Sequence, residues 1–286
     1  MPTKFLLLAA LVILTAVFLI IWLVAGGRTH PRDAAAPSAR QLGIGFVTNF
    51  WDTFGIGSFA TTTAAFKFWT IVRDEQIPGT LNVGHTVPTV IQALVFIAAI
   101  HVEAMTLTLM IAAACTGAWF GAGIVARLAR RRVQIGMGIA QLLALVPGGE
   151  AVGLTGTKLA IAVATNLALG ALMTLGVGLY APCMVLVSVL GMNPAVAFPI
   201  MMGSCAFLMP VAGLRFIRRR AYDVRAALGL TVGGPAAVLI AIWLLTSLPT
   251  TLVRGQVFVV IVYNSITMLR SACVERRMQV LGTDKR

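Results

Sequence analysis

The chain has 286 residues, of which 59% are hydrophobic and 11% are charged, and its formal net charge is +13. Soluble domains carry about 25% charged residues, so the composition excludes a soluble globular protein and indicates a chain embedded in a membrane. The basic residues lie in short clusters between apolar segments, which is the positive-inside pattern of a multi-pass membrane protein. We therefore expect a lipid bilayer as the surroundings and no nucleic-acid partner.

The segment from Phe5 to Gly26 is 22 residues of almost unbroken apolar sequence, close to the roughly 20 that a helix needs to cross a bilayer. It is longer than the apolar core of a secretory signal, and only Lys4 precedes it as a basic residue. We expect it to be a transmembrane helix.

The next block, Gln41 to Val72, is 32 residues long and has glycines at its centre, Gly55 and Gly57. As one helix it would be about 48 Å long, too long for a hydrocarbon core of about 30 Å. Divided at the glycines, it gives two arms that are each too short to span. We therefore predict a re-entrant helical hairpin, followed by spans over Gly84 to Ile100 and Ala104 to Ala126.

Val133 to Val146 is predicted to span outward and belongs to the first half of the chain. The second half begins with Lys158 to Leu190, a second long block that is broken by Gly176 and Gly178. Further spans are predicted at Ala195 to Gly213, Ala226 to Leu245 and Gln256 to Leu269. With seven spans and two hairpins, every major arginine cluster lies inside, the N-terminus outside and the C-terminus in the cytoplasm.

The two broken blocks resemble each other without a gap, as Phe54–Trp69 lies over Leu175–Leu190. One hairpin enters from inside and the other from outside, so we predict an all-α membrane protein built from two inverted repeats, as in many secondary transporters. The predicted parts are an N-terminal helix and loop (1–40), a first repeat (41–157, hairpin 41–72), a second repeat (158–273, hairpin 158–190) and a basic tail (274–286).

The sequences GIGSFATTT, from Gly55, and GVGLYAPC, from Gly176, resemble the glycine motifs of the sulfite exporter TauE/SafE family of membrane permeases. The likeness covers roughly Gln41 to Ser271. The resemblance implies export of a sulfur-containing anion, such as sulfite, sulfoacetate or a related sulfonate, across a bacterial inner membrane.

The residues around the breaks favour an anion on physical grounds as well. A helix that starts at mid-depth offers free backbone N–H groups and the positive end of its dipole, and glycine lets a ligand approach them. Hydroxyl groups add further donors. The predicted substrate-binding residues are Gly55, Gly57, Ser58, Thr61, Thr62, His85, Gly176, Gly178, Tyr180, Cys183 and Ser204. The alternative is that these small and hydroxyl residues only allow close packing or bond back to their own helix.

Asp52 stands out because a carboxylate beside an anion site would repel the ligand. It is a candidate proton carrier or gate, it could pair with His85 or cap the backbone after the break, or it could lie in a solvated vestibule without a special role. Secondary cavity candidates are Asn49, Asn82, Gln92, Asn166 and Asn264. Lys67 is expected to extend to the cytoplasmic interface.

Other kinds of function find little support in the sequence. Four cysteines (Cys115, Cys183, Cys205 and Cys273) lie in apolar segments without a CxxC pair, and there are only three histidines and no HExxH motif. Ser58 has no GxSxG-type surroundings that would suggest a protease. We expect no enzyme, metal or cofactor. The alternatives are a transporter of another small anion (a carboxylate or phosphate), an intramembrane enzyme and a non-transporting scaffold. The oligomeric state, monomer or homodimer, is left open.

Overall fold

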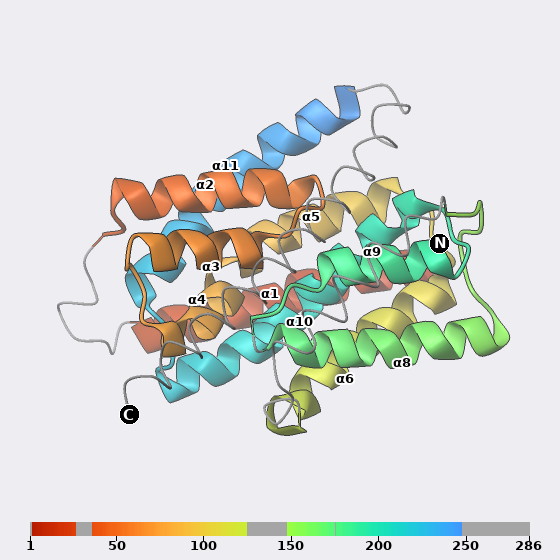
Figure 1. Cartoon of the computed structure of the whole chain (residues 1–286), viewed down its shortest axis with the longest axis horizontal. Helices are drawn as coiled ribbons and strands as arrows, with labels where there is room; N and C mark the ends of the chain where they lie inside the picture. Colours follow the sequence, from red (N-terminus) through yellow and green to blue (C-terminus); the bar gives the residue numbers. More distant parts are fainter. Residues whose placement is uncertain (1, 27–35, 125–147, 175, 248–286) are drawn as a thin grey trace, which may run out of the picture.

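The computed structural model describes residues 2–26, 36–124, 148–174 and 176–247, and these residues form helices joined by short turns, without a β-sheet (Figure 1). In chain order the elements are α1 (Pro2–Gly26), α2 (Ala39–Thr53), α3 (Ser58–Phe68), η1 (Asp74–Gln76), α4 (Ile77–Gly84), α5 (Thr86–Ala99), α6 (Ala104–Ile124), α8 (Gly156–Met173), α9 (Tyr180–Val189), η3 (Pro194–Val196), α10 (Ala197–Arg219) and α11 (Val224–Ser247).

Four helices are long and apolar enough to cross a membrane, at Thr3–Ala25, Gly156–Met173, Pro194–Arg219 and Val224–Leu245. A fifth candidate is the pair α4 and α5, which bend by 40° at a short break. These segments support a helical, membrane-embedded protein. The spans predicted at Val133–Val146 and Gln256–Leu269 lie outside the described residues, as do Asn264, Cys273 and the basic tail.

The span expected from Gly84 to Ile100 is divided in the structure, since α4 begins at Ile77 and α5 follows a break at His85. Pro88 explains the break, because its ring has no N–H to donate to the carbonyl of Gly84 and crowds that carbonyl. The hydroxyl of Thr231 in α11 donates to this carbonyl instead, at 2.9 Å. The backbone is thus satisfied by a neighbouring helix, as apolar surroundings require.

Both long apolar blocks are broken at their glycines. Gly55 and Gly57 in the first break have φ of 92° and 85°, and Gly176 in the second has 80°. The same backbone bonds recur 121 residues apart: Gly55 N–H donates to Asp52 O (2.8 Å), and Gly176 N–H donates to Met173 O (3.0 Å). In Figure 1, both breaks lie toward the middle of the long axis, and the two helix pairs extend from there toward opposite ends.

The first helix of each broken block packs against a long helix of the other half. Helix α2 lies along α11, and α6 lies along α8. Glycines allow these close approaches: a Cβ on Gly45 would lie 2.6 Å from Gly229 O, and one on Gly170 would lie 2.1 Å from Ala114 O. Small residues at helix contacts are typical of membrane proteins, where close packing supplies much of the stability.

Helix α10 is the centre of the core. It contacts α1, α4, α5, α6 and α9, and most of its residues are buried. Its buried residues combine small side chains with large ones, and the large ones include Met201, Met202 and Met209. Methionine adapts to irregular gaps, so this core can fill the space beside the two breaks without a rigid fit.

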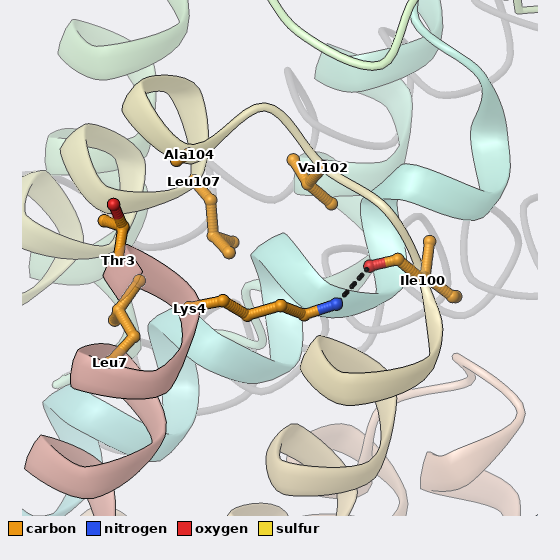
Figure 2. A pocket seen from close by; sticks show the side chains of 7 residues that line it. All are labelled: Thr3, Lys4, Leu7, Ile100, Val102, Ala104 and Leu107. Atoms are coloured by element: carbon orange, nitrogen blue, oxygen red, sulfur yellow. Dashed lines mark hydrogen bonds between the residues drawn. The ribbon is translucent and has the colours of Figure 1, made fainter. Parts of the chain in front are cut away.

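The N-terminal end of α1 is held to the turn between α5 and α6 (Figure 2). Lys4 Nζ donates to the carbonyls of Ala98 (2.9 Å) and Ile100 (3.4 Å), where α5 ends. A cation at a helix C-terminus is favoured by the helix dipole and satisfies carbonyls that have no partner within the helix. The small pocket around it contains none of the predicted site residues; it is lined by Thr3, Lys4, Leu7, Ile100, Val102, Ala104 and Leu107.

Candidate binding site at the two helix breaks

The two glycine breaks contact each other in a reciprocal way. A Cβ placed on Gly57 would lie 3.9 Å from Cβ of Tyr180, and a Cβ placed on Gly178 would lie 4.0 Å from Cβ of Phe59. Positions 57 and 178 are 121 residues apart, and so are positions 59 and 180. When two halves are related by a two-fold axis, each contact between them occurs twice, with the equivalent residues exchanged. The starts of α3 and α9 therefore meet at one point inside the molecule.

Asp52 lies at this meeting point with only 1% of its surface exposed. Its Oδ1 accepts a hydrogen bond from the backbone N–H of Ser58, the first residue of α3. The carboxyl group thus caps the helix after the break, which was one of the expected roles. The solvated vestibule does not fit this buried position, and the expected partner His85 bonds to other residues.

Tyr180, the first residue of α9, is joined to the first half by a chain of hydrogen bonds. Its hydroxyl donates to Gln92 Oε1 at 3.1 Å, and Gln92 Nε2 donates to Thr53 Oγ1 at 2.9 Å. The Thr53 hydroxyl then donates to the carbonyl of Asn49 at 2.9 Å. Gln92, expected only as a secondary candidate, is therefore the link between the two halves.

His85 belongs to a second chain of hydrogen bonds. Asn49 Nδ2 donates to Gly45 O at 2.7 Å, which leaves Asn49 Oδ1 as an acceptor 3.0 Å from His85 Nδ1. The proton of the imidazole is therefore assigned to Nδ1, and Nε2 accepts from the Thr62 hydroxyl at 3.0 Å. Asn49 takes part in both chains and connects them.

The second half contributes an apolar, sulfur-rich wall to the same place. A Cβ on Gly55 would lie 3.0 Å from Met184 Cε and 3.6 Å from Met201 Cε. Met173, at the position equivalent to Asp52, contacts the thiol of Cys205 at 3.4 Å. Cys183 is fully buried beside this wall in α9. The sequence analysis did not identify the methionines, because buried methionine in a membrane helix is ordinary.

Several predicted residues lie in other surroundings. The Thr61 hydroxyl bonds back to Ser58 O at 2.9 Å. Ser204 accepts from Asn166 Nδ2 at 3.0 Å, in a cluster with the carbonyl of Met110. Asn82 Nδ2 donates to Pro78 O within α4 at 2.8 Å. These bonds match the packing alternative for Thr61 and Asn82. Lys67 is exposed and pairs with Asp74 at 3.6 Å, in agreement with its expected position at the interface.

Some buried polar atoms of this region lack a hydrogen-bond partner. They include Asp52 Oδ2 and Thr89 Oγ1. Buried polar groups are nearly always satisfied, so an unsatisfied one in a native protein calls for a reason, such as a ligand, an ion or a proton. The arrangement can offer backbone N–H groups, hydroxyls and one carboxyl group to a small polar ligand.

Comparison with known proteins adds no identification. No protein-family profile, no curated protein and no solved structure matches this chain. The likeness to the TauE/SafE permeases thus rests on the two glycine motifs alone. The fold and site define a helical membrane protein with two helix breaks that meet in its interior.

Proposed function

We propose that the protein is a secondary transporter, an exporter of small sulfur-containing anions such as sulfite, sulfoacetate or related sulfonates, in a bacterial inner membrane. The observation that carries the proposal is the reciprocal contact of the two glycine breaks, Gly57 with Tyr180 and Gly178 with Phe59. Broken helices whose ends meet at mid-depth are the usual construction of substrate sites in secondary transporters.

In this proposal the two halves are inverted repeats, with the N-terminus outside and the C-terminus in the cytoplasm. The recurrence of the bonds of Gly55 and Gly176, 121 residues apart, supports it. So do the opposite directions of the two helix pairs (Figure 1). Helices α2–α3 and α8–α9 are then re-entrant hairpins, and transport proceeds by rocking one half against the other.

In this proposal the anion binds at the start of α9 rather than at the start of α3. The first turn of α9 has no side-chain cap, so the backbone N–H groups of Tyr180 and Ala181 are available, whereas Asp52 already caps α3. The hydroxyl of Tyr180 and the Thr62–His85 pair supply further polar groups. Because all these residues are buried, the described conformation is closed, and the ligand enters after the halves separate.

Counterflow in proteoliposomes tests this function. Purified protein is reconstituted with unlabelled sulfite or sulfoacetate inside, and uptake of the labelled anion is compared with that of sulfate, phosphate and small carboxylates. Counterflow of sulfite or a sulfonate is the expected result. Counterflow of phosphate or carboxylates alone would show that the transporter has a different class of substrate. The absence of counterflow for every anion tested would exclude the proposal.

A matched pair of threonine variants places the site. Thr62→Val removes the hydroxyl that bonds to His85, whereas Thr61→Val removes one that bonds only to its own helix. A net hydrogen bond is worth about 1 kcal/mol, so Thr62→Val should lower sulfite counterflow roughly fivefold and Thr61→Val should change it little. Equal effects of the two variants would contradict a site at this position.

A further inference from the structure

We infer that Asp52 is a proton-binding site and that a proton bound there is transported together with the anion. The inference rests on the proposed transport function and adds the identity of the coupling ion. Its starting point is the Asp52 carboxyl group, which is buried at the meeting point of the two halves and has one oxygen, Oδ2, without a partner.

The surroundings of Asp52 leave room for a proton on one oxygen. The groups that face the carboxyl group are Ser58, Gln92 and Tyr180. The backbone N–H of Ser58 donates to Oδ1, whereas Oδ2 is buried without a donor. A buried carboxylate oxygen without a donor is costly, and a proton on Oδ2 removes that cost.

The groups that face Asp52 also connect the two halves. The Tyr180 hydroxyl of α9 donates to Gln92, and Gln92 donates to Thr53 at the end of α2. The binding step is the addition of one proton to the Asp52 carboxylate, and no other bond breaks.

Protonation also changes the charge at the place where the anion is proposed to bind. The starts of α3 and α9 are positive dipole ends that converge there, and an ionised Asp52 would neutralise them and repel an anion. A protonated Asp52 would neither neutralise these dipole ends nor repel the anion. By linkage, a proton that favours anion binding is itself bound more tightly when the anion is present. The two ligands then move together, so export of both is driven by the higher concentration of the anion in the cytoplasm.

No other charged group among the described residues is placed to bind the proton that is transported with the anion. The titratable groups near Asp52 are Tyr180 on α9 and Cys205 on α10. Arg40, Lys67 and Arg225 lie near the outer ends of α2, α3 and α11, and Arg40 is 12 residues, or about 18 Å along the helix, from Asp52. His85 already uses both ring nitrogens in bonds to Asn49 and Thr62.

The test compares wild type with Asp52→Asn, using sulfoacetate, whose charge is constant between pH 6 and pH 8. An imposed pH gradient should drive sulfoacetate accumulation in wild-type proteoliposomes, and adding sulfoacetate to detergent-solubilised protein in weak buffer should cause proton uptake. In Asp52→Asn the addition of sulfoacetate should cause no proton uptake, and any sulfoacetate transport that remains should no longer depend on the pH gradient. Asp74→Asn, which changes an exposed carboxylate paired with Lys67, is the control and should behave as wild type.

The outcomes separate the two proposals. If wild type shows no sulfoacetate counterflow, the proposed sulfonate transport fails, and the coupling fails with it. If wild type shows counterflow but no pH-driven accumulation and no proton uptake, only the coupling fails. Proton-driven accumulation that survives in Asp52→Asn would assign the proton to another group and overturn the inference.

Discussion

At the scale of single residues, the two breaks share a backbone but differ in chemistry. Asp52 in the first corresponds to Met173 in the second, and Asn49 corresponds to Gly170. The first half thus supplies hydrogen-bonding groups, and the second supplies thioether and thiol groups. In the proposed transporter, the first half orients the ligand and the second half forms an adaptable, polarizable wall.

Two equivalent glycines should respond differently to the same substitution. Gly57 has φ of 85°, where an L-residue is strained by about 1–2 kcal/mol, whereas Gly178 does not have a positive φ and a Cβ there would make only an ordinary van der Waals contact with Phe59. Gly57→Ala should therefore lower the melting temperature by about 2–4 °C or more, and Gly178→Ala should leave it near the wild-type value. Thermal unfolding of both variants in detergent measures this, and an equal loss in the two would refute the assignment of strain to Gly57.

At the scale of helices, the turn between α5 and α6 is held by side chains from both sides. Glu103 accepts from the N–H groups of Met105 and Thr106 and from the Thr106 hydroxyl, at 3.1, 2.8 and 2.6 Å, at the start of α6. On the α5 side of the same turn, the Lys4 side chain donates hydrogen bonds to carbonyl groups at the end of α5 (Figure 2). These bonds fix the connection between the two helices.

The Glu103 cap predicts a pH-dependent contribution to stability. Hydrogen bonds from the Thr106 side chain and backbone hold the pKa of Glu103 below its ordinary value. The stabilisation is then fully present above the pH at which a free glutamate titrates, about 4.3, and is lost as the pH falls through the lower pKa of the folded protein. Glu103→Gln should be less thermostable than wild type at pH 7, and the difference should shrink as the pH falls below 4.

Glu75→Gln provides the comparison for this experiment, because Glu75 is exposed in η1. Its melting temperature should follow that of wild type at every pH. A Glu103→Gln deficit that stays constant from pH 7 to pH 3.5 would show that the lost charge is not its cause.

Helix positions were more predictable from sequence than the contacts between them. The length of apolar runs located α1, α6, α10 and α11, and the glycines located both breaks, because these signals are local. The break at His85 was missed because Pro88 lies inside an apolar run, and its effect depends on Thr231 from a distant helix. The bond between Tyr180 and Gln92 joins residues 88 positions apart, so no local pattern could indicate it.

At the scale of the whole molecule, the proposed rocking requires the two breaks to separate during transport. The pair Phe59 and Gly178 offers a direct test, since the 4.0 Å between Cβ of Phe59 and a Cβ on Gly178 is close to the mean of about 3.8 Å for disulfides. Phe59→Cys/Gly178→Cys, in a background without the four native cysteines, should cross-link on oxidation. Counterflow should then fall to background and return after reduction.

Each single-cysteine variant is the control for this experiment and should keep its activity after oxidation. Full counterflow by the oxidised, cross-linked protein would mean that transport does not need the breaks to part. That result would exclude rocking between the halves while leaving the anion site itself in place.

The crossed packing of the halves has a consequence for how the protein is made. Gly45 of α2 packs on Gly229 of α11, and 184 residues separate them along the chain (229 − 45). At synthesis rates of about 5–20 residues per second, α11 is synthesised roughly 10–40 s after α2. During that interval its glycine face is open to other helices at the insertion site. The packing of the first half can therefore be completed only after α11 of the second half has been synthesised. A truncated chain ending before α11 would be a target for membrane quality control.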